Sequence, residues 1–375
     1  MRVSEVTKKT SSRILTFDIL RGYFLSVILF NHLQYYPSPL TFVTGNGLLY
    51  ASTAEGFFAV SGIVLGIIRG RKLIEAPFKK AAALLLQRSF QLYLTSIILT
   101  LLFTFIGSFF IGSTGLKYGI FTDWQNIGDL FLKTITLQYT YGWADFLRYY
   151  ALFLFFAPAA LWLLRKGYWY LVIAISLLVW CLFPLSPFPP EISQPISWQV
   201  IFFGGFVIGY YWPLLVEYWH KLSSKSQKTI GTSLVVTAAI TMAASFMLVF
   251  GHTLGGVIGT QLDELHHLLE QGFNKDRLPI TRILIGAIWF WALFWLIRKH
   301  EAAIMKRIGW LLLPLGENSL YVYTVQAFVV FFAHLFILKP GGSDNVFVDF
   351  IVSLLALTLV WIAVRTKFLM KIIPR

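Results

Sequence analysis

Long apolar stretches recur along the whole chain, and most approach the ~20 residues that an α-helix needs to cross the hydrocarbon core of a bilayer. Ordinary soluble domains have roughly 45–50% apolar and about 25% charged residues. This chain has 57% hydrophobic and only 13% charged residues. Because a segment inside a bilayer must satisfy its own backbone polar groups, the sequence predicts an all-α, polytopic bundle of membrane helices.

The apolar stretches predict about ten membrane spans in a single domain over residues 1–375. The predicted spans cover residues 15–36, 53–70, 82–112, 146–164, 168–184, 196–216, 229–250, 279–298, 318–338 and 346–365. Short cytoplasmic loops of membrane proteins hold an excess of Lys and Arg. Ten spans with both termini in the cytoplasm place most of the 31 Lys and Arg on that side. Nine or eleven spans distribute these basic residues over both sides of the membrane. We therefore expect a multi-pass protein embedded in the lipid bilayer of the cell inner membrane.

The net charge of +14 follows from basic cytoplasmic loops that face anionic lipid, so no nucleic-acid partner is expected. The predicted outer face has two longer connections, residues 113–144 and 251–277. The first contains an amphipathic stretch at 127–135 that is typical of an interfacial helix. The second contains a short predicted helix with the adjacent pair His266 and His267. Because adjacent residues point to different sides of a helix, this pair predicts no metal site.

Two series of glycines at four-residue spacing occur within predicted spans. The first comprises Gly62, Gly66 and Gly70, and the second comprises Gly205 and Gly209. Small residues four apart let membrane helices approach each other backbone to backbone. Both series are therefore interpreted as helix-packing surfaces.

The first predicted span carries Asp18, Arg21 and His32 inside its apolar run. Arg21 and His32 are eleven positions apart, so on an α-helix they lie within about 20° of one face and ~16 Å apart along the axis. An arginine inside a span costs on the order of 2.5–3.5 kcal/mol and normally faces a partner, for which Asp18 is the nearest candidate. Arg88 enters the third span at a similar cytoplasmic depth. Two such guanidinium groups could converge on one anionic ligand, with His32 farther out as a possible general base.

A structural interpretation of the same residues stays open. Arg21 could extend along the helix toward the membrane surface, as long cationic side chains do. His32 could be a helix-end histidine whose ring bonds a backbone carbonyl. The spacing of the residues by itself does not decide between the two interpretations.

Several segments resemble the acyltransferase-3 superfamily in matching order. The segment "DILRGYFLSVILFNH" is similar to the opening signature of that superfamily, an Arg followed by ten residues and a His in the first membrane helix. The segment "AEGFFAVSGIVLGIIRGRK" resembles its second-helix element, in which an acidic residue precedes two aromatics and Ser-Gly. Three later segments are similar to the OpgC branch, named for transfer of succinyl groups onto osmoregulated periplasmic glucans. They are "ADFLRYYALFLFFAPAALWLLRK", "ISWQVIFFGGFVIGY" and "LGENSLYVYTVQ".

The resemblance implies a membrane acyltransferase that takes an acyl group, with succinyl as one candidate, from acyl-coenzyme A (acyl-CoA) and passes it to a carbohydrate hydroxyl. Acyl-CoA is then a co-substrate, and no tightly bound cofactor is expected. By the same resemblance His32 falls on the proposed catalytic histidine, Arg21 on its partner arginine, Glu55 on the acidic residue of the second-helix element and Arg88 on a basic position of the third helix. His32 and Glu55 are therefore the predicted catalytic residues, and Arg21 and Arg88, from their charge and shared depth, the predicted donor-binding residues. The chain departs from the OpgC branch at Gln326, where a histidine often follows "SLYVY".

A sugar acceptor needs aromatic faces and hydrogen-bonding groups, and the first outer connection, together with the residue that follows it, supplies both. The predicted acceptor-binding residues are Trp124, Tyr141, Trp143 and Asp145. Aromatic residues also gather at the interface of any membrane protein, so a purely interfacial role stays open for each. Two other functional classes remain as alternatives, a transporter or flippase of an envelope glycan or lipid intermediate, and a non-catalytic membrane scaffold. A transporter is expected to show discontinuous spans in an inverted repeat, and a scaffold has little reason to keep charged residues in its spans.

Overall fold

The computed structural model describes residues 14–373, apart from 72, 113–114, 117–118, 144, 186–189, 337–341 and 344, and all of its described elements are helices. The basic segment 1–13 thus lies outside the described residues. Each of the ten predicted spans falls on a helix. These helices are α1 (Leu15–Leu33), α3 (Thr53–Leu65), α4 (Phe78–Ser108), α6 (Asp145–Arg165), α7 (Trp169–Cys181), α8 (Pro190–Tyr210), α10 (Ser224–Phe250), α12 (Ile280–Lys299), α14 (Ser319–Phe336) and α15 (Val346–Arg365).

Shorter helices connect and extend these elements. They are α2 (Thr41–Thr44), α5 (Ile127–Ile135), α9 (Trp212–Lys221), α11 (Gly256–Glu270), α13 (Glu301–Glu317), the π-helical turn η2 (Gly66–Arg71), and the 3₁₀ turns η1 (Gly45–Gly47), η3 (Trp124–Asn126), η4 (Phe183–Leu185), η5 (Gly251–Leu254) and η6 (Gln271–Phe273). The predicted interfacial and outer helices correspond to α5 and α11. On α5, Leu130 is buried while Ile127, Phe131 and Ile135 are exposed, which leaves an apolar face toward the surroundings.

Seven helices in the described part of the chain are by themselves long and apolar enough to cross a membrane, or eight if α8 and α9 form one broken span. α8 and α9 meet at 67°, so the predicted span 196–216 is wrong at its end: the helix stops at Tyr210 and the chain turns. The two remaining predicted spans are α1, which carries several polar residues, and α7, which has 13 residues. The protein is therefore a multi-pass membrane protein, while the count of ten and the cytoplasmic termini stay predictions.

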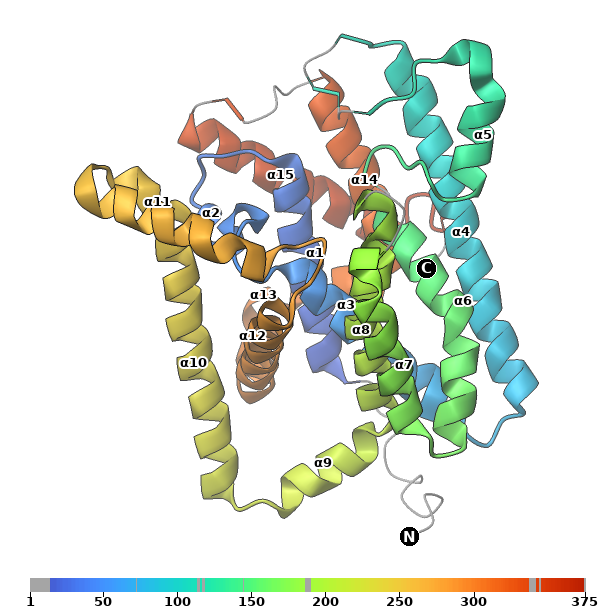
Figure 1. Ribbon diagram of the computed structural model, residues 1–375, viewed down its shortest axis with the longest axis vertical. Coiled ribbons are helices and arrows are strands. Elements are labelled where there is room, and N and C mark those ends of the chain that lie inside the picture. The colour runs from blue at the N-terminus through green and yellow to red at the C-terminus, as the bar shows by residue number, and fades with distance from the viewer. Residues whose placement is uncertain are drawn as a thin grey trace.

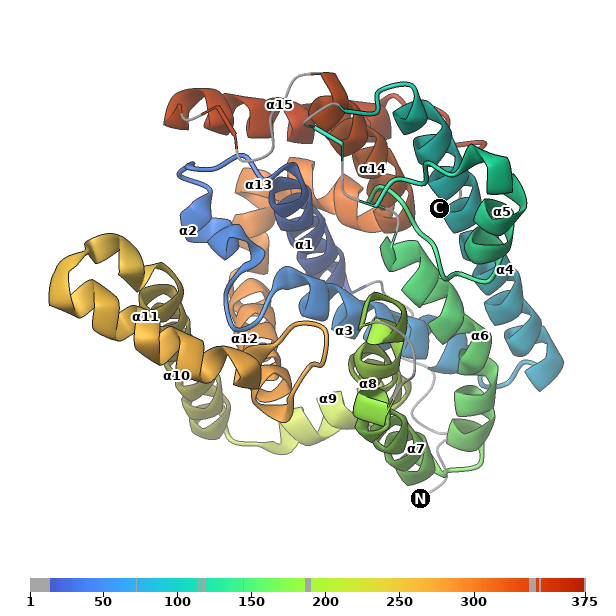
Figure 2. The same ribbon diagram turned by 45° about the horizontal axis from the view of Figure 1, so that its top comes forward.

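α1 lies inside the bundle, where it packs against α3, α12, α13 and α14 (Figure 2). The contact with α13 is a backbone contact, because a Cβ on Gly22 would lie 2.1 Å from the carbonyl oxygen of Leu312. A Cβ on Gly316 would lie 1.8 Å from the carbonyl oxygen of Asp18. α13 was not predicted from the sequence. Its burial of α1 explains how α1 keeps polar residues away from lipid.

The two predicted glycine surfaces pack against each other, at the contact between α3 and α8. A Cβ on Gly62 would lie 2.1 Å from the carbonyl oxygen of Phe202, and one on Gly209 would lie 2.0 Å from that of Ile63. Gly205 meets the backbone of Ala59 in the same way. The interpretation of both series as packing surfaces is confirmed.

The two ends of the bundle differ in what lies on them. α5 and α11 lie at one end, and α9 lies at the other, where it links α8 to the peripheral helix α10 (Figure 1). The two connections that were assigned to one outer face are therefore at one end of the molecule. Side-chain contacts between α1 and α14 join the starts of these two helices to each other, and likewise their ends.

Candidate functional site

A line of polar groups joins α1 to α14, and we call it the α1/α14 seam, comprising Arg21 and His32 of α1 and Ser319, Gln326 and His334 of α14. Near the start of both helices, Nη1 of Arg21 donates to Oγ of Ser319 at 3.4 Å. Near their ends, Nε2 of His334 lies 3.1 Å from the backbone oxygen of His32. The two helices therefore run in the same direction, as expected of the first and ninth of the predicted spans.

Arg21 has the partner that the sequence predicted. Its guanidinium group forms an ion pair and a hydrogen bond with the buried carboxylate of Asp18, one turn earlier on α1. Nε of Arg21 is buried and has no hydrogen-bond partner among the described residues. Arg21 is thus held in place by Asp18 and Ser319 while part of its donor capacity is left over.

The start of the seam is surrounded by further cations. Arg21, Arg69 and Arg88 all interact electrostatically with Tyr150 of α6, which is partly buried. Arg88 also interacts electrostatically with Arg69, and its Nη1 donates to Oε1 of Gln91 on its own helix, at 3.3 Å. Arg21, Arg69 and Arg88 are therefore all near Tyr150, while the joint binding of a donor by Arg21 and Arg88 stays a prediction.

Arg69 was counted in the sequence analysis only as a basic residue of a loop. In the structure it belongs to the π-helical turn η2, which continues α3 from Gly66 to Arg71. π-Helical turns are rare overall, but those that occur are often found at functional sites. They redirect the side chains that follow. The sequence signal for this turn is weak, since a run of "GIIRGR" also fits an ordinary helix end.

The far end of the seam gathers His32, His334 and Trp143. The His334 ring stacks on the Trp143 ring, with 4.9 Å between centroids and 19° between planes. His32 is partly exposed. Asp145 starts α6 two residues after Trp143 and interacts electrostatically with Tyr323 of α14. Trp143 is therefore brought to the end of α14 that contacts the His32 backbone, whereas Asp145 lies near Tyr323 in the first half of α14.

The other two predicted acceptor residues lie elsewhere. Trp124 is 38% exposed and packs edge-on to Phe121, whose ring in turn contacts Tyr139. Tyr141 is 2% exposed, and burial raises the pKa of its hydroxyl to about 12. Its ring is therefore packed on protein, against the region of Gly107 in α4, rather than open to a ligand.

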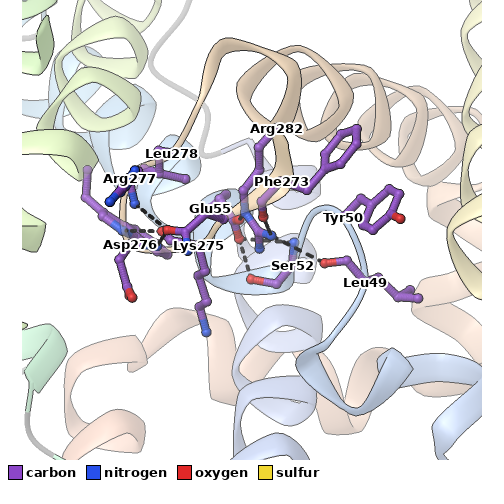
Figure 3. Close-up of polar contacts among 12 residues, drawn as sticks. Leu49, Tyr50, Ser52, Glu55, Phe273, Lys275, Asp276, Arg277, Leu278 and Arg282 are labelled. Carbon is purple, nitrogen blue, oxygen red and sulfur yellow. Dashed lines mark hydrogen bonds and ion pairs between the residues drawn. The ribbon is translucent and has the colours of Figure 1, made fainter. Parts of the chain in front are cut away.

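Glu55 lies in a different cluster, at the start of α3 (Figure 3). Its carboxylate accepts from the backbone N–H of Ser52 at 3.1 Å and from the Ser52 hydroxyl, which closes a capping box. Nε of Arg282 donates to Oε1 of Glu55 at 2.6 Å, and both side chains are buried. Nη1 of Arg282 bonds the carbonyl oxygens of Phe273 and Leu49, at 2.7 and 3.4 Å.

These contacts give Glu55 the structural role that a buried acid paired with an arginine performs. The partner is Arg282, on α12, and not Arg88. The Glu55 carboxylate lies in a cluster separate from the seam residues. A catalytic role for Glu55 stays a prediction. Its bonds instead tie the start of α3 to the start of α12.

Sequence reasoning missed Ser319, His334 and Arg69 as site residues. Ser319, Gln326 and His334 lie within about 80° of one face of α14, at intervals of seven and eight residues. Counting polar residues on one face of the predicted span 318–338 could therefore have found the α14 side of the seam. Gln326, identified only as a departure from the family pattern, lies on that face.

The two adjacent histidines of α11 contact different neighbouring side chains. Among the described residues, no group of three or more His, Cys, Asp or Glu side chains is arranged to hold a metal ion. Nδ1 of His266 is 3.1 Å from the hydroxyl oxygen of Tyr50, and the two rings stack. His267 interacts with Asp263 and Glu270, each at 3.7 Å.

Together, the apolar helices define a class, a multi-pass membrane protein, and polar residues follow the contact between its helices α1 and α14. The sequence profile described as OpgC protein matches residues 13–372, and the chain belongs to the OpgC family. Membership of this family implies a membrane enzyme of the transferase type. No protein of curated function and no solved structure matches the chain.

Proposed function

We propose that this protein is a membrane-bound O-acyltransferase of the cell inner membrane. It moves an acyl group, for which succinyl is the first candidate, from acyl-CoA to a hydroxyl of a cell-envelope or periplasmic carbohydrate. The observation that carries the proposal is the α1/α14 seam, which has a cluster of guanidinium groups at one end and a histidine at the other.

The cation cluster suits the donor. Coenzyme A carries phosphate groups at one end and the reactive sulfur at the other. Arg21, Arg69 and Arg88 offer planar forks of N–H donors, which bind phosphate oxygens with good geometry. Arg88 interacts electrostatically with Tyr150 and with a second cation, Arg69, so an anionic ligand relieves repulsion there. Acyl-CoA binds and leaves as a co-substrate.

The histidine end suits the chemistry. His32 takes the proton of an acceptor hydroxyl while the oxygen of that hydroxyl attacks the thioester carbonyl carbon. A histidine side chain can accept a proton in this way near neutral pH. A C–O bond forms, the C–S bond breaks, and the thiolate leaves with the proton that His32 held. The products are an ester and free coenzyme A. Trp143, stacked on His334, offers an aromatic face for the acceptor.

Mass spectrometry of envelope glycans tests the proposal in cells. Glycans from a deletion strain are expected to lack an acyl substituent that the parent strain carries, and a plasmid copy of the gene is expected to restore it. The acyl mass difference also identifies the transferred group. Identical glycans in parent and deletion strains would contradict the proposal.

A further inference from the structure

Gln326 of α14 carries a buried side-chain amide. It is 1% exposed, and neither Nε2 nor Oε1 has a hydrogen-bond partner among the described residues. Gln199, on α8, is a matched contrast. It is also buried, but its Nε2 donates to the Ser176 carbonyl oxygen at 2.7 Å and its Oε1 accepts from the Ser176 hydroxyl at 2.6 Å.

An unpaired buried amide is costly, because the group loses its bonds to water and gains none in return. Most buried polar groups in folded proteins are therefore paired, and an exception calls for an explanation such as a ligand. Gln199 shows that this bundle can satisfy a buried glutamine with its own residues. The unpaired amide of Gln326 is therefore informative.

The position of Gln326 along α14 indicates which part of a bound donor would lie beside it. It lies seven residues, or ~10 Å, beyond Ser319 and eight residues, or ~12 Å, before His334. The residue is thus between the cation cluster and the histidine end of the seam. If phosphates bind at the cations and the thioester reaches His32, the connecting arm of the donor must cover the ~16 Å between Arg21 and His32.

We propose that Gln326 binds the amide groups of the pantetheine arm of coenzyme A, an inference that rests on the proposed function. The arm carries two secondary amides, which supply both an acceptor for Nε2–H and a donor for Oε1. A purely aliphatic chain supplies neither, and a lone carbonyl supplies only an acceptor. Gln326 therefore holds the arm along the seam and presents the thioester to His32.

Binding measurements on the full-length protein in lipid nanodiscs test this inference with two probes. Coenzyme A has the nucleotide and the arm, whereas adenosine 3′,5′-bisphosphate lacks the arm. Gln326→Met keeps the length of the side chain and removes both polar atoms. It is expected to raise the Kd for coenzyme A roughly 10-fold and to leave the Kd for the bisphosphate unchanged. Gln326→Asn, which keeps the amide but shortens it, is expected to give an intermediate loss.

Gln199→Met is the matched control. It is expected to lower the midpoint of thermal unfolding, because Ser176 loses its partner, and to leave coenzyme A binding unchanged. Gln326→Met is expected to keep the wild-type midpoint or to exceed it.

Unchanged coenzyme A binding in both Gln326 variants would overturn the inference, as would an equal loss for the two probes, which places the effect at the cation end. If the wild-type protein bound neither probe, the proposed function itself would fail.

Discussion

The Glu55–Arg282 cluster and the α1/α14 seam both contain buried arginine, yet their charges are compensated in different ways. In the cluster, Arg282 meets a carboxylate and two carbonyl oxygens, and Glu55 caps a helix. At the seam, Asp18 pairs with Arg21, the neighbouring Arg88 interacts electrostatically with Arg69, and Gln326 has no hydrogen-bond partner among the described residues. Charges that the fold itself pairs hold helices together, and we propose that the less completely paired groups near the seam mark a place where a ligand binds.

Replacing His32 is expected to give the largest effect on the seam. His32→Gln keeps hydrogen bonding and approximate size but cannot accept a proton, so acyl transfer is expected to fall by ~10²–10⁴-fold with donor binding intact. Membrane abundance, coenzyme A binding and product formation are measured on one preparation. Near-normal transfer by a well-expressed variant would return His32 to a structural role.

Breaking the Glu55–Arg282 pair is expected to affect the fold instead of the chemistry. Glu55→Gln retains a side chain that suits the capping box but leaves the Arg282 charge uncompensated, at a cost of about 3–5 kcal/mol in unfolding free energy. Thermal unfolding in detergent measures the loss, and Glu55→Gln with Arg282→Met is expected to recover most of it. A stable Glu55→Gln protein that binds donor but transfers nothing would instead support the predicted catalytic role of Glu55.

The cation end of the seam is expected to give a smaller, purely ligand-dependent effect. Arg88→Met should raise the Kd for coenzyme A roughly 10- to 100-fold while thermal stability is kept or improved, because repulsion from Arg69 is relieved. Arg165→Met is the control. Arg165 donates to the carbonyl oxygens of Ala76 and Leu73, at 2.9 and 2.6 Å, so its loss should lower stability and spare binding. Equal donor affinity in wild-type and Arg88→Met proteins would remove Arg88 from the site.

His334 is expected to give the smallest effect, since it supports α1 and does not react. His334→Gln can still donate to the His32 carbonyl oxygen, and transfer should stay within roughly 3-fold of wild type. His334→Leu removes the donor and should lower the rate of transfer roughly 10-fold with unchanged coenzyme A binding. A larger loss in His334→Gln than in His32→Gln would assign the base role to His334.

The sequence predicted the helices well because hydrophobic length and periodicity are local properties. It also predicted the shared face of Arg21 and His32, since eleven residues on one helix fix their relation. It did not predict α13, whose charged residues, including Lys306 and Arg307, keep its hydropathy low although one face packs on α1.

The sequence also did not predict which residues of distant helices pair with each other. Glu55 and Arg282 are 227 positions apart, and His32 and His334 are 302 apart. Such pairs depend on tertiary packing, which a single sequence does not encode at any fixed spacing. Arg69 was missed for a related reason, because a π-helical turn has no strong local signature.

Acyl transfer by the purified protein tests the account most directly. The full-length protein in nanodiscs is given succinyl-CoA, or acetyl-CoA in a parallel sample, together with a glucan acceptor. Released thiol and acylated glucan are then quantified together. The account predicts one free coenzyme A for each ester formed, with both products lost in His32→Gln. Undiminished ester formation by His32→Gln, or an unmodified glucan in the presence of bound donor, would contradict it.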